Sequence, residues 1–176
     1  DFLLLENKRL RKLIDESIRS EEIFAKVLVD NDSPYLKSII LNKGSKDQVK
    51  LGMAIIDGSY LVGKVIEVNF TNSRALLLSD LNSKIPVLLE PFDMHAVLSG
   101  TGQNYGVIEY TKEEYENLME GDVIVYTSGQ GGLFKPGLPV GKFTYDNENR
   151  NLINFFSDFK QLDYVKIVSY NIGASN

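Results

Sequence analysis

The chain has 176 residues, of which 43% are hydrophobic and 24% charged, as in ordinary globular proteins with one domain or two small ones. Its net charge of −5 argues against nucleic acid or anionic lipid as the main partner, because both attract clusters of Lys and Arg. The absence of cysteine excludes disulfides, thiolate metal sites and thiol catalysis. The basic cluster Lys8-Arg9-Arg11-Lys12 is interpreted as a solvated helix face.

The first segment, residues 1–22, has a helical pattern. Leu3, Leu10 and Ser17 recur every seven residues, and Asn7 and Ile14 each follow four residues later. This spacing is typical of a coiled-coil seam, and a single Asn within such a seam favours two parallel strands. We therefore predict a dimer seam of Leu3, Asn7, Leu10 and Ile14. The alternative is a single helix that packs one stripe against its own domain.

From residue 23 onward the apolar pattern alternates with a period of two. Short apolar runs are separated by Asn, Asp, Gly, Ser and Pro, which indicates an all-β barrel or sandwich arrangement. The predicted strands are 23–29, 39–41, 53–56, 61–68, 75–78, 85–89, 95–98, 106–110, 122–126, 139–145, 153–156 and 164–169. Only residues 112–119 interrupt the runs with helical character.

A short internal repeat suggests two similar β-domains. The segment Leu61-Val62-Gly63-Lys64-Val65 resembles Pro139-Val140-Gly141-Lys142-Phe143, and each follows a run that begins with glycine, at Gly52 and at Gly121. We therefore expect a helix at 1–22, a first β-barrel domain at 23–90 and a second at 91–176, joined near Glu90-Pro91. The sequence leaves open whether strand 164–169 closes the second barrel or returns to the first.

No residue pattern supports catalysis or a cofactor. The segment 58–65 matches a phosphate-binding loop up to Lys64, but Val65 stands where Ser or Thr should hold magnesium, and a strand pattern follows instead of a helix. A serine hydrolase would have to combine Ser128 with the one histidine, His95, and with Asp80, Asp93 or Asp122. Because the G-x-S-x-G elbow is missing around Ser128, we expect no enzyme. With one His, no Cys and scattered carboxylates, we expect no metal site, and we expect no cofactor.

The glycine-rich stretch TSGQGGLFKPGLPVG, residues 127–141, is interpreted as a connection between strands. Its glycines allow the chain to fold back after strand 122–126, and Pro136 and Pro139 restrict its freedom before the next strand.

The same stretch also resembles the MreC family of bacterial rod shape-determining proteins. Four motifs occur in order: the segments at 42–53, 61–65 and 97–102, and the glycine-rich stretch with its preceding strand at 121–141. Departures from the family pattern are confined to Gln48, Tyr60 and Lys135, which lie in turns or at a strand edge. The motif residues, to which we assign structural roles, are Lys43, Gly44, Gly52, Gly63, Gly100, Gly102, Gly121, Asp122, Thr127, Ser128, Gly129, Gly132, Pro139 and Gly141.

The resemblance implies a periplasmic fragment of a protein anchored in the bacterial inner membrane by a helix absent from this chain. It implies a coiled-coil helix followed by two small barrels similar to halves of trypsin-like proteases, without their catalytic machinery. The implied role is a homodimeric scaffold of cell-wall elongation, with MreD, MreB and the elongation penicillin-binding transpeptidase as partners. Two alternatives stay open: a filament subunit that acts by self-assembly alone, and a serine hydrolase that uses Ser128 and His95.

Overall fold

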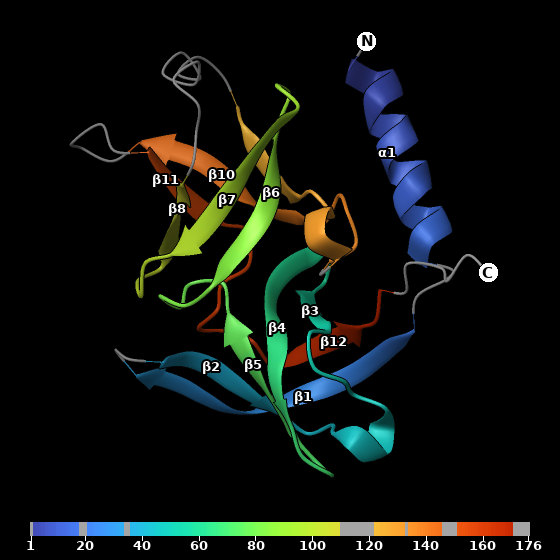
Figure 1. Ribbon diagram of the computed structural model, residues 1–176, viewed down its shortest axis with the longest axis vertical. Helices are drawn as coiled ribbons and strands as arrows, with labels where there is room; N and C mark the ends of the chain where they lie inside the picture. The colour runs from blue at the N-terminus through green and yellow to red at the C-terminus, as the bar shows by residue number, and fades with distance from the viewer. Residues whose placement is uncertain are drawn as a thin grey trace.

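A computed structural model describes residues 2–17, 21–33, 36–109, 122–132, 134–145 and 151–170. It consists of helix α1 (Phe2–Ser17) and twelve β-strands that form two closed barrels. Figure 1 shows the barrels stacked one above the other, with α1 alongside the upper barrel. No helix among the described residues is both long and apolar enough to cross a bilayer. The predicted helical segment at 112–119 lies outside the described residues.

The first barrel, the lower one in Figure 1, is closed by β12, the last strand among the described residues. Its strand order is β1-β12-β3-β4-β5-β2, and all neighbours are antiparallel. The strands are β1 (Glu22–Ser33), β2 (Leu36–Leu41), β3 (Ala54–Asp57), β4 (Tyr60–Val68), β5 (Ser73–Leu77) and β12 (Tyr164–Val168). A short 3-10 helix, η1 (Ser45–Asp47), lies between β2 and β3.

The second barrel is built from six strands that follow one another in the chain. Its strand order is β10-β11-β8-β7-β6-β9, again antiparallel throughout. The strands are β6 (Lys84–Glu90), β7 (Met94–Gly100), β8 (Tyr105–Glu109), β9 (Ile124–Thr127), β10 (Pro139–Tyr145) and β11 (Asn151–Phe155). The 3-10 helix η3 (Gln130–Gly132) lies in the connection from β9 to β10. Each of the twelve predicted strands overlaps one observed strand, which confirms the mainly β, two-barrel architecture.

The boundary between the barrels differs from the expected join near Glu90-Pro91. Strand β6 pairs with β7 and β9, so it belongs to the second barrel although it precedes that join. Strand β12 pairs with β1 and β3 and completes the first barrel. The expected ranges 23–90 and 91–176 therefore each include one strand of the other barrel, because strand pairing is a long-range choice that a strand's own residues do not encode.

Strand β6 illustrates how alternation with a period of two residues builds the core of the second barrel. Ile85, Val87 and Leu89 are at most 1% exposed and point into the barrel. Leu88 and Glu90 alternate with them and face outward. This alternation presents an apolar and an acidic side chain on the outer surface of the second barrel, on the side where α1 lies.

The two barrels share one hydrophobic core at their interface. Ile56 and Leu61 of the first barrel belong to the same buried cluster as Phe134 and Val140 of the second. At the rim, the Ser157 hydroxyl donates a hydrogen bond to the Asp57 carboxylate at 2.6 Å. The rings of Tyr60 and Phe156 pack nearby, with their centroids 5.1 Å apart. This continuous burial holds the barrels in one arrangement.

Candidate interaction site at the helix–barrel junction

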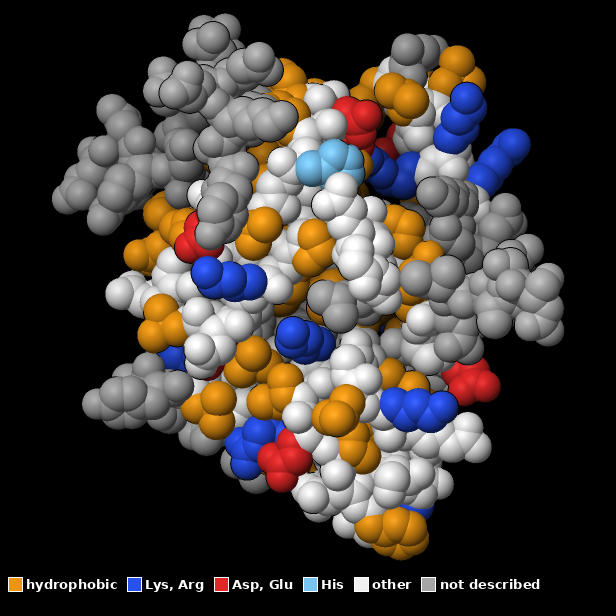
Figure 2. Space-filling model, viewed as in Figure 1, with side chains coloured by type: hydrophobic (Ala, Val, Ile, Leu, Met, Phe, Trp, Pro, Cys, Tyr) orange, Lys and Arg blue, Asp and Glu red, His pale blue; other side chains and the backbone are white. Residues whose placement is uncertain are grey.

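Helix α1 presents an unusually apolar surface to solvent. Its sequence is rich in Leu, Lys, Arg and Glu, which are good helix formers. Five large hydrophobic side chains are between 47% and 71% exposed: Phe2, Leu3, Leu4, Leu5 and Leu10. Figure 2 shows hydrophobic side chains gathered at the free, upper end of the helix. Among the described side chains of α1, residues 2–11, none belongs to either hydrophobic core.

The residues of the predicted dimer seam lie on one stripe of this helix. Leu3 is 70% exposed, Leu10 is 47% exposed, and Asn7 is exposed between them. Residues three and four apart share a helix face, so these three side chains form a continuous strip. The side chain of Ile14 lies outside the described residues. The strip is available for a second helix, and its pairing stays a prediction.

Arg9 points away from that stripe and toward the second barrel. At 3.6 residues per turn, it lies about 200° around the helix from Asn7. Its Nη2 is 2.8 Å from the Oε1 of Glu90, and its guanidinium lies 3.9 Å from the centroid of the Tyr126 ring. Glu6, one turn earlier, contributes a further ion pair at 3.6 Å. The interpretation of the basic cluster as a solvated face is therefore wrong for Arg9, because distant residues supply its partners.

Tyr126 contributes the aromatic ring on which the Arg9 guanidinium stacks. Only 8% of the residue is exposed, although it stands on the outer face of β9. Burial raises the pKa of the Tyr126 phenol above 10.0, the nearby Arg9 guanidinium opposes the shift, and Glu6 and Glu90 add to it. The ring therefore keeps its proton at physiological pH and offers Arg9 an uncharged π face.

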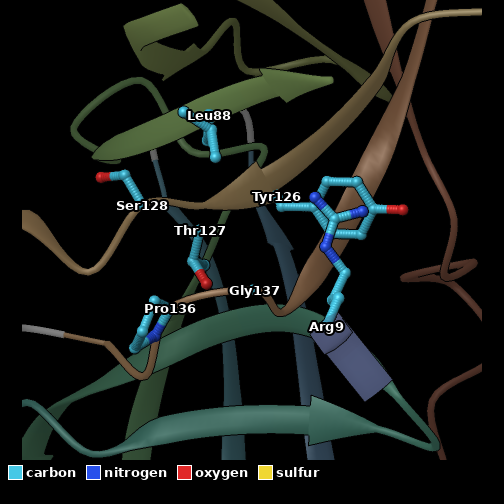
Figure 3. Close-up of a pocket in the computed structure, with 7 residues that line it drawn as sticks. All are labelled: Arg9, Leu88, Tyr126, Thr127, Ser128, Pro136 and Gly137. Atoms are coloured by element: carbon cyan, nitrogen blue, oxygen red, sulfur yellow. The ribbon is translucent and has the colours of Figure 1, made fainter. Parts of the chain in front are cut away.

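A cavity of about 220 Å³ lies beside this contact. It is lined by Arg9, Leu88, Tyr126, Thr127, Ser128, Pro136 and Gly137. Figure 3 shows Arg9 reaching from the helix to stack over the Tyr126 ring, while Pro136 and Gly137 form another part of the lining. The cavity thus lies between α1, the strand β9 and the glycine-rich connection.

Thr127 fixes that connection to the barrel. It is 1% exposed, and its Oγ1 donates to the backbone oxygen of Lys135 at 2.6 Å and accepts from the Leu138 amide at 2.9 Å. Gly129 and Gly137 have φ values of 77° and 84°, which only glycine adopts without strain. The interpretation of residues 127–141 as a structural connection agrees with this geometry.

Ser128 directly follows β9, whereas His95 lies on β7. The Ser128 hydroxyl accepts a hydrogen bond from the Gln130 amide at 3.3 Å. His95 is exposed on β7, opposite Leu88, which in turn lies opposite Tyr126. Two strand spacings, about 10 Å, therefore separate His95 from β9.

Two of the candidate aspartates have other partners. Asp80 is 1% exposed and its carboxylate accepts a hydrogen bond from the Lys37 amide at 2.7 Å, and Asp122 forms an ion pair with Lys142 at 2.9 Å. Among the described residues, His95, Asp80 and Asp122 therefore have positions or partners other than those that a triad with Ser128 would require.

The other motif residues are spread over turns and strand contacts of both barrels. Gly63 and Gly141 stand where two strands approach so closely that a Cβ would collide with the backbone oxygens of Leu76 and Asn154. Gly44 and Gly100 face backbone oxygens in the same way. Positive φ values occur at Gly52, Gly102 and Gly132. Lys43 is half-buried, Pro139 pairs with Tyr126, and Gly121 lies outside the described residues.

Sequence reasoning missed the Arg9–Glu90–Tyr126 contact. Its members come from three distant segments, and each type of residue is common on protein surfaces. The one available signal was Tyr126 within an otherwise aliphatic strand, next to Thr127 and the glycine-rich connection.

The fold and this junction define a two-barrel β-protein with an exposed apolar helix. Residues 27–169 match the family model described as "Rod shape-determining protein MreC, barrel core". The chain belongs to the MreC family, which is a family of shape-determining structural proteins and is not a known enzyme family.

Curated relatives carry the same name. The chain is 32% identical over 170 residues to the cell shape-determining protein MreC of Cereibacter sphaeroides, covering 94% of this chain and 56% of that protein. It is 34% identical over 162 residues to that of Haemophilus influenzae, covering 91% and 45%. The chain therefore spans about half the length of these relatives.

Solved structures agree with the fold. MreC from Pseudomonas aeruginosa superposes with a TM-score of 0.76 at 26% identity, covering 85% of this chain and 99% of that one. A structure described as the major periplasmic domain of the cell shape-determining filament MreC has a TM-score of 0.71 at 18% identity, covering 86% and 99%. A complex between penicillin-binding protein PBP2 and MreC from Helicobacter pylori gives 0.61 at 14% identity, covering 85% and 99%. The last two likenesses establish the fold alone.

Proposed function

We propose that this chain is the periplasmic part of a non-catalytic scaffold that maintains rod shape by organising cell-wall elongation. The observation that carries the proposal is the exposed apolar face of α1 on a chain of the MreC family. Exposed apolar side chains along one helix face, such as Leu3 and Leu10, favour contact with another protein surface. Two rigidly joined barrels behind that helix provide surfaces for other proteins.

In this proposal the partner of α1 is a second copy, paired through Leu3, Asn7, Leu10 and Ile14. The exposed Leu3 and Leu10 supply apolar knobs, and Asn7 favours two parallel strands. Pairing doubles every barrel surface and thereby raises the avidity for partners that are themselves clustered. In this proposal the dimer is anchored at the inner membrane, and MreD and MreB are reached through the membrane and cytoplasmic parts of the whole protein.

The proposed main partner of the barrels is the elongation penicillin-binding transpeptidase. Support comes from the Helicobacter pylori relative, whose structure is described as a complex with PBP2. Its low identity limits the comparison to the fold, so the binding surface on this chain has to be mapped by mutation.

Calorimetric titration with the periplasmic part of the same organism's transpeptidase tests the proposal. Saturable binding by the dimer is expected. Leu10→Asp should reduce the sedimenting mass to that of a monomer, because it places a charge in the seam. Lys8→Asp, at an exposed position off the seam, is the control and should leave the mass unchanged. No heat of binding from a confirmed dimer would contradict the scaffold, and an unchanged mass of Leu10→Asp would contradict the seam.

The second candidate function is a subunit that acts by self-assembly alone. It is favoured by the relative whose structure is described as a cell shape-determining filament. Growth beyond the dimer with increasing protein concentration, without binding of the transpeptidase, would support this candidate.

A further inference from the structure

We propose that Glu90 and Tyr126 form a receptor for an arginine side chain, which Arg9 occupies within the same chain and which an arginine of a partner protein can occupy when α1 is released. The receptor lies on the outer face of the second barrel and binds a guanidinium group. It is separate from the dimer seam, which lies on another face of α1.

The geometry of the receptor selects a planar cation. The Oε1 of Glu90 lies 2.8 Å from Nη2 at one edge of the Arg9 guanidinium. The Tyr126 ring lies against the face of the guanidinium, with its centroid 3.9 Å from the Cζ of Arg9. A guanidinium satisfies both demands at once, because it donates in its plane and stacks with its face. A lysine ammonium has no flat face and is more strongly hydrated, so it fits this pair less well.

Arg9 attaches α1 to the second barrel through an ion pair with Glu90 and a cation–π contact with Tyr126. The apolar residues Phe2, Leu3, Leu4, Leu5 and Leu10 all remain largely exposed. Among the described side chains of α1, residues 2–11, these five therefore contribute little apolar burial against the barrel. An ion pair and a cation–π contact are each modest at a protein surface, so a contact of this kind is reversible.

Release of α1 would uncover more than the two receptor residues. The adjoining cavity of about 220 Å³ is lined by Leu88, Pro136 and Gly137 in addition to Arg9 and Tyr126. Leu88 and Pro136 give this lining an apolar part beside the Tyr126 ring, which suits the aliphatic stem of an arginine. The partner's arginine would thus compete with Arg9 for the same surface.

The attachment is tested by a distance measurement. The chain has no cysteine, so spin labels at Lys8→Cys on α1 and Gln103→Cys on the second barrel report their separation without background. We expect one narrow distance distribution in the parent, and a broad one shifted to longer distances in Arg9→Gln and in Glu90→Gln. Arg11→Gln is the matched control, because it removes the same charge from an exposed arginine two residues away. An unchanged distribution in Arg9→Gln would overturn the proposal.

The receptor itself is tested in the Arg9→Gln variant, in which it is empty. Titration with N-acetyl-arginine amide, followed by NMR of labelled tyrosine rings, should give a saturable shift of one ring, with affinity on the order of millimolar. The shift should be lost in Arg9→Gln/Glu90→Gln, and it should be weaker with N-acetyl-lysine amide. Absence of binding to Arg9→Gln, or equal binding to Arg9→Gln and Arg9→Gln/Glu90→Gln, would overturn the proposal of an arginine receptor. Neither measurement depends on the transpeptidase.

Discussion

The two barrels have the same strand arrangement but are assembled differently from the chain. In the second barrel, β6 lies between β7 and β9, and in the first, β12 lies between β1 and β3. The remaining strands correspond one to one, in the order β1 to β5 and β7 to β11. The strands of the second barrel follow one another in sequence. The sixth strand of the first barrel, β12, comes only after all strands of the second. The comparison teaches that one arrangement of strands tolerates two chain orders.

The likeness extends to a local irregularity. The pairing of β3 with β4 shifts register at Val62, and the pairing of β9 with β10 shifts at Val140. The next residues, Gly63 and Gly141, each lie tight against the backbone of the following strand. The short repeat seen in the sequence therefore marks the same bulged hairpin in both barrels.

The outer faces of the two barrels differ in what covers them. Ile56 of β3 and Tyr126 of β9 occupy corresponding register positions, and both are less than 9% exposed. Ile56 is covered by the apolar core shared with the second barrel. Tyr126 is covered by Arg9 of α1. The same position thus supports a permanent apolar contact in one barrel and a polar, exchangeable contact in the other.

The largest expected effect comes from charging the strands that differ in chain order. Ile167 of β12 and Leu89 of β6 correspond in register, and each is 0% exposed. An unpaired carboxylate in either core should cost more than about 5 kcal/mol, comparable with the stability of a whole domain. Amide hydrogen exchange should show Ile167→Asp losing protection in the first barrel while the second keeps it, because the second contains all its strands.

Tyr164→Asp, at a position that is 64% exposed on β12, is the control and should leave protection in place. Loss of protection throughout both barrels in Ile167→Asp would show that they unfold as one unit.

The equivalence of the bulged hairpins is tested by Gly63→Ala and Gly141→Ala. Each added Cβ meets a backbone oxygen that cannot move alone, so we expect both variants to lose about 2–4 kcal/mol of unfolding free energy. Gly131→Ala meets nothing within 4 Å but has a φ of 74°, so it should lose only about 1 kcal/mol. Urea denaturation measures all three. A Gly141 variant as mild as the Gly131 variant would show that the two hairpins are not equivalent.

The connections of these hairpins also differ, and Thr127 tests that difference. Two residues, Gly58 and Ser59, join β3 to β4, while the longer connection from β9 to β10 depends on the Thr127 hydroxyl. Thr127→Val keeps the shape but leaves a buried carbonyl and amide without this partner, at an expected cost of about 2 kcal/mol. The Thr144 hydroxyl on β10 donates a longer hydrogen bond, 3.4 Å, to the backbone oxygen of Leu152. Thr144→Val should therefore cost less than about 1 kcal/mol of stability. Thermal unfolding gives both values, and equal losses would contradict the role of Thr127.

The smallest effect concerns the exchangeable contact at Tyr126. Because burial raises the pKa of this phenol above 10.0, the unfolded chain releases the proton at a lower pH than the folded chain does. In alkaline solution the folded state then binds more protons, so its stability should fall as the pH rises through 10 and beyond. Tyr126→Phe should show a shallower decline in urea unfolding from pH 8 to pH 11. Identical slopes would show that the ring is not buried in solution.

The sequence predicted the elements of this fold far better than their pairing. Alternating apolar residues, as in Ile85, Val87 and Leu89, mark a strand locally and place its buried face. They do not say which strand lies beside it, so β6 was expected in the wrong barrel. The Arg9 contact was not predicted for a similar reason. Glu90 and Tyr126 contact Arg9 only after the barrel has closed and α1 lies against it.

The position of β12 has a consequence for how the protein is made. A ribosome releases the chain from its first residue onward, and domains commonly fold in that order. Here β1 finds its neighbour β12 only after the strands β2 to β11 have emerged, since Glu22 pairs with Val168. The strands β6–β11 are complete earlier, so the second barrel can close during synthesis while the first is still open. The newborn chain would then present unpaired edges of β1 and β3 until its last strand arrives, a period in which it would need protection by a chaperone.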